Sequence, residues 1–246
     1  MVTMISFVIP AYNEEGCLRV CLLSIKKEIT ASSCEAEIIV VNNASTDRTG
    51  EIARSISGVI VVDEPQKGLT HARSAGFKAS HGEIIANIDA DVRLPTGWLT
   101  AVTQEFRNDP KLVLVSGPQL YDDLPFFPLM ITRIMYGVEF CVYLLGRFIL
   151  RQGTMVQGGN FVIRRDALEK IDGYDTTIAF YGEDADIGRR VTPLGDTTWS
   201  FRFGVNASGR RFKHEGVFLV MLKYSLAYLW INLTGKPFSQ KYSDVR

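Results

Sequence analysis

Short runs rich in isoleucine and valine alternate with stretches of helical periodicity along the first 120 residues. Between the first two runs, Leu18, Cys21, Leu22 and Ile25 recur at the spacing of one helix face. This alternation is typical of a parallel sheet covered by helices on both faces, whose strands are buried on both sides. The sequence therefore predicts an α/β fold. The predicted strands are residues 5–9, 37–41, 58–62, 83–88 and 112–115.

The second half of the chain departs from this alternation. Residues 125–150 are strongly apolar but carry three charges at intervals. A strand containing a Gly-Gly pair is predicted over residues 156–165, followed by a helix that begins at Asp166. The polar residues 181–190 lead into a further helix.

A last apolar stretch, residues 217–233, is 17 residues long and has one charge, Lys223. A membrane span needs about 20 apolar residues, so this stretch is short for one. A helix lying in the membrane interface would let Lys223 reach water while Tyr224, Tyr228 and Trp230 lie at headgroup depth. We therefore expect peripheral attachment to a membrane. Packing on the rest of the chain, or on a second subunit of a homo-oligomer, is the alternative that the pattern leaves open.

Composition narrows the class of protein further. The chain has 246 residues, of which 46% are hydrophobic and 22% charged, which suits one soluble domain or one domain with a small addition. The 27 Lys and Arg residues balance the 27 Asp and Glu residues, so a nucleic acid is not an expected partner. The four cysteines form no Cys-x-x-Cys pair, and the N-terminus lacks the basic start of a signal peptide. We expect a cytoplasmic protein with free thiols.

Polar side chains follow three of the predicted strands, at the point where each strand ends. They are Pro10-Ala11-Tyr12-Asn13-Glu14, Asn42-Asn43-Ala44-Ser45-Thr46-Asp47 and Asp89-Ala90-Asp91. Open parallel sheets bind ligands in the crevice at the carboxyl ends of their strands. The three groups are therefore expected to converge on one rim.

Asp89 and Asp91 suggest a metal site. Side chains at i and i+2 of an extended chain point the same way, so the two carboxylates face one small volume. Mg²⁺ and Mn²⁺ accept carboxylate oxygens together with phosphate oxygens. His214, in a locally basic strip, is a candidate third ligand. A solvated pair of aspartates in a turn before Pro95 is the structural alternative.

A second acidic cluster, Gly182-Glu183-Asp184-Ala185-Asp186, opens a predicted helix. Acids in a first helical turn ordinarily complement the helix dipole. The functional alternative is a general base that projects into the crevice, whose pKa the preceding Phe180-Tyr181 would raise by excluding water. Lys67 and Arg73 flank another helix start, where cations and backbone amides would suit a diphosphate.

These motifs together resemble those of family 2 glycosyltransferases, and the match covers roughly residues 4 to 215. In chain order they are Val8-Ile9-Pro10-Ala11-Tyr12-Asn13-Glu14-Glu15, Val41-Asn42-Asn43-Ala44-Ser45-Thr46-Asp47-Arg48-Thr49, Lys67-Gly68 with Ala72-Arg73-Ser74-Ala75-Gly76, Asp89-Ala90-Asp91, Gly158-Gly159-Asn160-Phe161 and Gly182-Glu183-Asp184. The resemblance implies a single GT-A-type, Rossmann-like domain over residues 1–215, with a mixed, largely parallel central sheet flanked by helices. Residues 216–246 would then form an apolar helix and a polar C-terminal tail.

The resemblance also implies where a nucleotide-sugar donor binds. The residues that it assigns to the donor are Pro10, Ala11, Tyr12, Glu14, Asn42, Lys67, Arg73, Asp89 and Ala90. Within this set Asn42 would face the base and Asp89 the ribose or the metal, while Asp91 would bind the metal that bridges the two phosphates. A nucleoside diphosphate leaves readily only when its developing charge is neutralised, so the implied cofactor is Mg²⁺ or Mn²⁺.

The resemblance also implies which residues act on the acceptor. The resemblance implies an inverting transfer, with direct displacement at the anomeric carbon. Asp184 would take the proton of the acceptor hydroxyl, with Glu183 supporting the acceptor site and Gly159 and Asn160 near the acceptor and sugar. The acceptor would be a carbohydrate or a lipid-linked molecule, reached from the inner face of the membrane.

One departure from the family bears on the donor. Many members have Asp where this chain has Asn42, and that Asp accepts the N–H of uracil. Asn can accept through its carbonyl and donate through its amide, so UDP is favoured while GDP and dTDP stay open. A non-catalytic nucleotide-sugar binding or scaffold protein of the same fold is the competing hypothesis. A sugar-nucleotide pyrophosphorylase is disfavoured, because the Gly-rich phosphate loop expected after its first strand is absent from the sequence.

Overall fold

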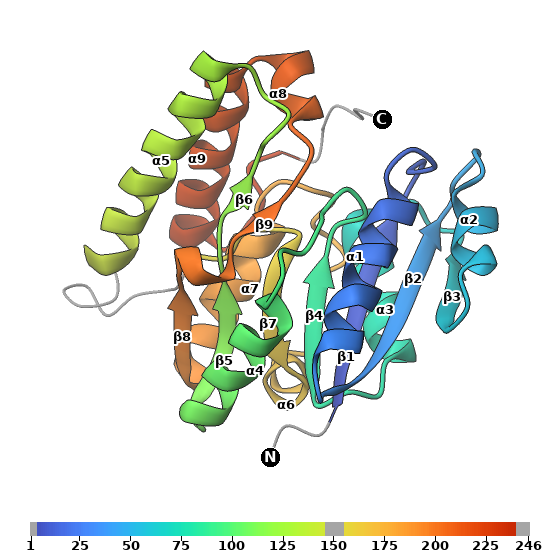
Figure 1. Ribbon diagram of the computed structural model, residues 1–246. Helices are drawn as coiled ribbons and strands as arrows, with labels where there is room; N and C mark the ends of the chain where they lie inside the picture. The colour runs from blue at the N-terminus through green and yellow to red at the C-terminus, as the bar shows by residue number, and fades with distance from the viewer. Residues whose placement is uncertain (1–3, 146–154, 240–246) are drawn as a thin grey trace.

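The computed structural model describes residues 4–145 and 155–239, and a seven-stranded sheet lies at the centre of this part of the chain (Figure 1). Its strands are β1 (Met4–Ala11), β2 (Glu35–Asn43), β3 (Val59–Glu64), β4 (Ile84–Ile88), β5 (Leu112–Ser116), β7 (Asn160–Arg164) and β8 (Asp196–Trp199). They are ordered β3-β2-β1-β4-β7-β5-β8. Only β7 runs antiparallel to its neighbours β4 and β5 within this sheet. The expected mixed, largely parallel sheet is therefore confirmed.

Helices cover both faces of the sheet (Figure 1). One layer contains α1 (Leu18–Ala31), α2 (Thr49–Ser55) and α4 (Trp98–Asn108), and the other contains α3 (Leu69–Ala79), α6 (Arg165–Lys170) and α7 (Glu183–Val191). Because side chains alternate along a strand, Phe7 packs against Trp98 in one core, whereas Val8 belongs to a second core with Leu168. Burial on both faces explains why the strands read as continuous apolar runs.

All five strands predicted in the first half of the chain are present. The predicted strand over residues 156–165 starts later, at Asn160, because its first residues form a turn in which the Asn160 N–H donates to the Gln157 carbonyl at 3.0 Å. Strand β8 and the small parallel pair β6 (Gln119–Leu120) and β9 (Val205–Asn206) were not predicted. They have two to four residues each and show no apolar run. Two short 3₁₀ turns, Thr192–Leu194 and Phe201–Phe203, flank β8.

Three further helices lie at one end of the sheet: α5 (Phe126–Leu145), α8 (Arg210–Glu215) and α9 (Val217–Thr234). Helices α5 and α9 pack side by side (Figure 1). The apolar stretch 125–150 of the sequence forms α5 from Phe126 to Leu145. Its residues 146–150 lie outside the described residues.

The apolar C-terminal helix is confirmed as α9, which also packs on α7 and α8. Its Ile231 is buried against Ile178 and Ala185. The expected division at residues 215 and 216 falls at Gly216, which has a φ of 84° between α8 and α9. The domain boundary itself stays a prediction, and the tail from residue 240 onward lies outside the described residues.

Candidate active site

A pocket opens at the carboxyl ends of β1 and β4, where the expected groups of polar residues meet. Residues from the end of β2, the start of α3, and α8 and α9 also line it, together with β6 and neighbouring loops. Eight of the predicted donor and metal residues line it, namely Pro10, Ala11, Tyr12, Glu14, Lys67, Asp89, Ala90 and Asp91. The predicted convergence at the sheet rim is thus what the structure shows.

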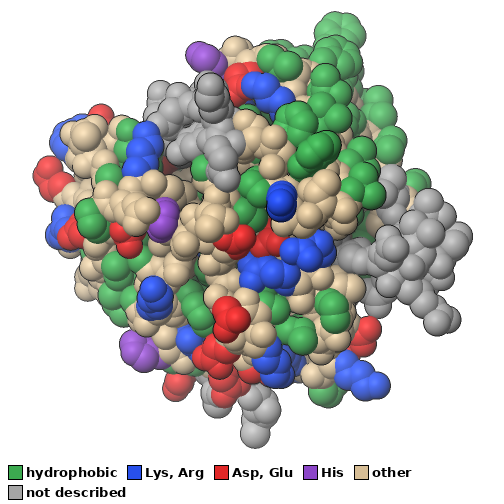
Figure 2. Space-filling view, turned by 180° about the vertical axis from the view of Figure 1, so that it is seen from behind, with side chains coloured by type: hydrophobic (Ala, Val, Ile, Leu, Met, Phe, Trp, Pro, Cys, Tyr) green, Lys and Arg blue, Asp and Glu red, His purple; other side chains and the backbone are tan. Residues whose placement is uncertain are grey.

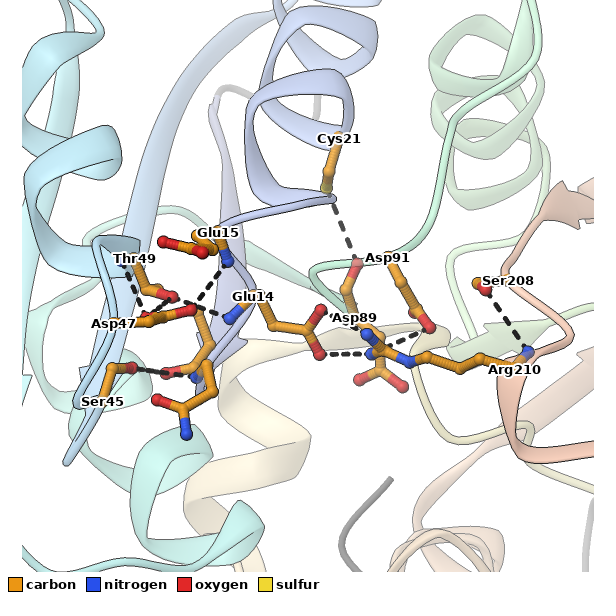
Figure 3. Close-up of polar contacts among 12 residues, drawn as sticks. Glu14, Glu15, Cys21, Ser45, Asp47, Thr49, Asp89, Asp91, Ser208 and Arg210 are labelled. Carbon is orange, nitrogen blue, oxygen red and sulfur yellow. Dashed lines mark hydrogen bonds and ion pairs between the residues drawn. The ribbon is translucent and has the colours of Figure 1, made fainter. Parts of the chain in front are cut away.

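The loops after β1 and β2 are tied together by polar contacts (Figure 3). The Glu14 N–H donates to the Thr49 hydroxyl at 2.7 Å, and the Glu15 N–H donates to the Asp47 carboxylate at 3.1 Å. Asn13, with a φ of 51°, accepts a bond from the Thr46 N–H at 2.8 Å. One buried and two exposed backbone donors bond here to side chains of the neighbouring loop, and these bonds hold this part of the rim together.

Lys67 and Tyr12 lie on the same side of the pocket. The Lys67 Nζ is 3.8 Å from the centroid of the Tyr12 ring, at the distance of a cation–π contact. Lys67 is exposed near the end of the loop leading to α3, so its ammonium lies at the pocket entrance.

Arg210, the first residue of α8, crosses the pocket to two acidic residues (Figure 3). Its guanidinium donates to a Glu14 carboxylate oxygen at 2.8 Å and lies 3.2 Å from an Asp91 carboxylate oxygen. Burial lowers the pKa of Arg210, but the two carboxylates outweigh that effect and raise it. The guanidinium therefore stays charged.

Arg73 links the pocket to the second acidic cluster from within α3. Its side chain is fully buried, lies 3.4 Å from an Asp89 carboxylate oxygen and donates to the Glu183 carboxylate. Burial raises the pKa of Glu183 to about 8, and the adjacent Arg73 guanidinium opposes that rise. Arg73 does not line the pocket. It is buried beneath the pocket wall, where its contacts position Asp89 and Glu183.

The turn Gly158-Gly159 lies between the two acidic clusters. The Gly158 N–H donates to the Asp184 carboxylate at 3.0 Å, and the Gly159 carbonyl accepts the Asp89 N–H at 3.2 Å. A Cβ at Gly159, whose φ is 75°, would lie 2.2 Å from the Asp89 carboxyl group. Only glycine permits this approach, so the turn holds Asp89 and Asp184 on either side of itself.

Asp184, the second residue of helix α7, lies in surroundings that disfavour its charge. Burial raises the pKa of Asp184, while the N–H groups of Ala185 and Gly158 oppose the rise. Glu139 of α5 is also half-buried nearby; burial raises its pKa to about 7, and the negative charge of Asp184 adds to the effect. A carboxylate with a raised pKa and a fixed orientation suits proton abstraction near neutral pH.

The structure places Asn42 elsewhere than predicted. Its amide donates to the Asp63 carboxylate at 2.8 Å, and it is Asn43 that lines the pocket. The reason is strand alternation, since adjacent side chains of β2 point to opposite faces. Asn43 accepts the Gly68 N–H at 2.8 Å and thereby holds the loop before α3. A contact between Asn42 and the base stays a prediction without support from this placement.

Two further predicted residues are not placed for their expected roles. Asn160 is 1% exposed, and its amide donates to the carbonyls of Gly117 and Phe203, both at 2.8 Å. It joins loops instead of facing a sugar, as a buried amide must find partners. His214 is exposed on α8, and within residues 4–145 and 155–239 no three His, Cys, Asp or Glu residues gather as a metal cluster. The structure therefore does not support His214 as a third ligand.

Asp89 and Asp91 nevertheless fit a divalent cation. Both line the pocket, with side chains 34% and 15% exposed. Mg²⁺ beside a nucleotide is usually held by one or two carboxylates, with phosphate oxygens and water completing its shell. Asp89 and Asp91 supply two carboxylates in one pocket, so a third protein ligand is not needed for such a shell.

Several pocket residues were not among the site residues predicted from the sequence, although Asn43 belongs to one of the groups expected at the rim. They are Gln119, Tyr121, Asn43, Arg210, Arg211 and Tyr224. The basic strip around residues 210–214 was the one signal that pointed to this side of the pocket. Gln119 is held by the Tyr121 hydroxyl at 3.0 Å and donates to the Gly158 carbonyl at 3.0 Å, contacts that local sequence does not reveal.

Solved structures share this fold. A mannosyltransferase from Pyrobaculum calidifontis in complex with GDP-Man and Mn²⁺ matches with a TM-score of 0.70 at 19% identity, over 92% of this chain and 61% of that one. Glucosyl-3-phosphoglycerate synthase from Mycobacterium tuberculosis, in complex with Mn²⁺ and UDP-glucose, matches with a TM-score of 0.63 at 19% identity, over 97% of this chain and 81% of that one.

Sequence comparison identifies the family. The probable glycosyltransferase YdaM of Bacillus subtilis is 30% identical over 202 residues, which are 78% of this chain and 47% of that protein. A dolichol-phosphate mannosyltransferase of Pyrococcus furiosus is 25% identical over 68% of this chain and 48% of that protein. The chain thus spans about half the length of these two relatives. The family model for glycosyl transferase family 2 matches residues 6–172. Because this match covers more than half of the chain, the protein belongs to glycosyltransferase family 2.

Proposed function

We propose that this glycosyltransferase is a metal-dependent, inverting enzyme that moves a sugar from a nucleotide-sugar to an acceptor hydroxyl. One observation carries the proposal: Asp89 and Asp91 face a pocket, and Asp184 is fixed across the Gly158-Gly159 turn from Asp89. An inverting displacement needs one group of residues for the leaving diphosphate and a separate base for the attacking hydroxyl. The two acidic clusters supply both.

On the donor side, the diphosphate would lie between Asp89, Asp91 and Lys67, with the nucleoside against Ala11 and Tyr12. Bound Mg²⁺ or Mn²⁺ would supply Lewis-acid neutralisation of the leaving diphosphate. The matched structures that contain Mn²⁺ with GDP-Man or UDP-glucose support a donor of this class. UDP is the favoured nucleotide, with GDP and dTDP as the alternatives to be tested.

On the acceptor side, Asp184 would accept the proton of the attacking hydroxyl. Its two backbone hydrogen bonds, from Gly158 at 3.0 Å and Ala185 at 2.8 Å, fix the orientation of the carboxylate. Glu183 is 6% exposed and paired with Arg73, so it would support the acceptor site by holding that guanidinium. General-base catalysis of this kind contributes about 10²–10⁴ in rate.

We further propose that the acceptor is carbohydrate or lipid-linked and that the enzyme lies on the inner face of a membrane. Hydrophobic side chains gather over one end of the molecule (Figure 2), the end that α5 and α9 form in the ribbon view (Figure 1). The exposed ones are Phe126, Phe127, Met130, Ile134, Val138, Phe218, Leu219, Leu222, Leu226, Leu229, Trp230 and Leu233. A contiguous apolar surface of this kind marks an interaction site. Tyr224 of α9 lines the pocket, so the same helix borders both the apolar surface and the site.

Helix α9 is the one described helix that is long and apolar enough to cross a membrane, and 22% of it is buried in the protein. Its charge, Lys223, is paired with Glu215, which keeps both groups at one side of the helix. Attachment in the interface leaves the Lys223 side chain, which is 35% exposed, in contact with water, whereas a span would bury it. Peripheral contact is therefore the form of membrane association that we propose.

Donor turnover tests the central proposal. We expect release of nucleoside diphosphate from UDP-glucose, GDP-mannose or dTDP-glucose to require Mg²⁺ or Mn²⁺, and the NMR spectrum of the product to show an inverted anomeric centre. Asp184→Asn should bind the same nucleotide without releasing product. Binding without turnover by the wild type, across a panel of carbohydrate and lipid-linked acceptors, would favour the non-catalytic binding protein.

Flotation with liposomes tests the membrane proposal. Replacing Leu222, Leu226 and Leu229 together with Gln should reduce flotation, because these exposed side chains are the ones that would enter the interface. Val20→Gln with Leu23→Gln is the matched control, since both side chains are exposed on α1, which lies over the sheet away from α5 and α9 (Figure 1). A wild-type protein that never floats and forms a stable soluble oligomer would assign the apolar surface to a subunit interface.

A further inference from the structure

Arg210 connects two loops that are far apart in the sequence. Its guanidinium donates to Glu14, which follows β1, and approaches Asp91, which follows β4, at 2.8 and 3.2 Å (Figure 3). The Glu14 side chain is 4% exposed and that of Asp91 is 15% exposed, so both carboxylates lie largely out of water. The positive charge thus lies directly against the carboxylate that we propose for the metal.

A guanidinium and a divalent cation compete for one carboxylate. Arg210 faces Oδ2 of Asp91, and a cation bound to the same group would lie within a few ångströms of the guanidinium and repel it. The backbone beside Arg210 is anchored, since the Gly209 N–H donates to the Asp123 carboxylate at 2.7 Å. The long side chain of Arg210, and not its backbone, would therefore move away from the cation.

A displaced Arg210 still has an anionic partner within reach. Guanidinium groups bind carboxylates and phosphates with the same bidentate geometry. Arg210 lines the pocket beside Asp91, where the diphosphate of the donor would lie, and Glu14 remains as its second contact.

We propose that Arg210 is an internal counter-cation of Asp91, which the metal displaces together with the nucleotide, and that Arg210 then binds the diphosphate. This inference rests on the proposed function for the identity of the ligand. It has two consequences of opposite sign. Arg210 weakens binding of the metal alone, because it occupies Asp91, and it strengthens binding of the metal with a nucleoside diphosphate.

Calorimetry on the full chain separates these consequences. The probes are Mn²⁺ alone, and UDP and GDP at saturating Mn²⁺. Arg210→Gln should bind Mn²⁺ alone several-fold more tightly than wild type and bind the nucleotide about tenfold more weakly, as loss of a charge-assisted hydrogen bond predicts. Arg202→Gln is the matched control, because Arg202 is exposed and contacts Gln104 and Glu105 on the protein surface.

Two more variants distinguish a change in binding from a loss of folding. Glu14→Gln combined with Arg210→Gln removes the buried carboxylate that would otherwise lose its partner, and it should keep the tighter binding of Mn²⁺ alone. Arg210→Lys keeps the charge and should keep the weak binding of Mn²⁺ alone. Thermal unfolding of each variant reports whether it is folded.

Two results would overturn the inference: binding of Mn²⁺ alone that is unchanged or weaker in Arg210→Gln, or nucleotide binding equal to that of Arg202→Gln. A wild-type protein that binds neither UDP nor GDP with Mn²⁺ would overturn the proposed function as well. If the wild type binds a nucleotide and Arg210→Gln behaves as the control does, the inference alone fails.

Discussion

The N-terminal and C-terminal halves of the site are built from different contacts. In the N-terminal half, residues 10–91, the pocket wall consists of strand ends, the loops beside them and the first turn of α3. Hydrogen bonds such as that from the Glu14 N–H to the Thr49 hydroxyl fix these loops. In the C-terminal half, residues 119–224, the wall consists mainly of side chains carried by helices and loops, including Arg210 and Tyr224. The N-terminal half is thus fixed by contacts between its own loops, whereas the C-terminal half presents long side chains to the pocket.

The largest effect should come from the C-terminal half. Asp184→Asn removes the proposed base while keeping the shape of the side chain, so the transfer rate should fall by about 10²–10⁴. Nucleotide affinity should change little, because Asp184 does not line the pocket. Steady-state kinetics with calorimetry measures both. Asp166→Asn, an exposed acid in the first turn of α6, is the matched control. Transfer near the wild-type rate in Asp184→Asn would refute the assignment.

The junction between the halves can be broken at Gly159. Gly159→Ala forces a Cβ to within 2.2 Å of the Asp89 carboxyl group and also adopts a φ of 75°. Gly58→Ala is a matched control, because its φ is 79° and nothing lies within 4 Å of its Cβ. Thermal unfolding should show a loss of about 1–2 kcal/mol for the control from backbone strain. Gly159→Ala should lose about 1–3 kcal/mol more from the forced contact, and it alone should weaken metal-dependent nucleotide binding. Equal behaviour would mean that Asp89 moves aside freely.

Glu139 gives the C-terminal half a pH-dependent stability. Its pKa is raised to about 7 in the folded protein, from 4.5, so between these pH values the folded state holds a proton that the unfolded state has released. Stability therefore falls as the pH rises through this range. Glu139→Gln should be no more stable than wild type near pH 4.5 and roughly 1–3 kcal/mol more stable near pH 8. The exposed Glu169→Gln should show no such trend in denaturant unfolding. If the stability difference between Glu139→Gln and wild type did not depend on pH, the Glu139 carboxyl group would be in contact with water and not buried.

The smallest effect is expected at Asn42. Asn42→Asp should change the ratio of UDP to GDP affinity by less than about threefold, because the side chain contacts Asp63 outside the pocket wall. Asn43→Asp should do more, since Asn43 holds the loop before α3 through Gly68. Competition binding measures both ratios. A change of tenfold or more in Asn42→Asp would restore the predicted contact with the base.

The same contrast explains what the sequence could reveal. Asp89 and Asp91 were predicted because a strand end and its next residues are local features, and the sheet brings such ends together. Arg210 was not predicted, because its contact with Glu14 joins residues 196 positions apart and depends on how α8 packs. His214, chosen from the same basic strip, lies about one helical turn further along α8 and is exposed.

Motif resemblance located the segments that meet at the pocket more reliably than the individual side chains that line it. The Gly158-Gly159-Asn160 motif does lie between the acidic clusters, yet its glycines make the close approach and Asn160 is a buried link between loops. Asn42 and Asn43 belong to one motif, and only the register of β2 decides which of them faces the pocket. Such choices follow from packing and strand phase, which a motif does not encode.

The most direct measurement is calorimetric binding of UDP and GDP to the wild type and to Asp91→Asn, with Mn²⁺ and with a chelator in its place. A donor site that depends on a metal at Asp91 predicts that the wild type binds at least one nucleotide about tenfold or more tightly with Mn²⁺, and that Asp91→Asn loses this gain. Equal affinity with and without Mn²⁺, or a full gain in Asp91→Asn, would contradict it.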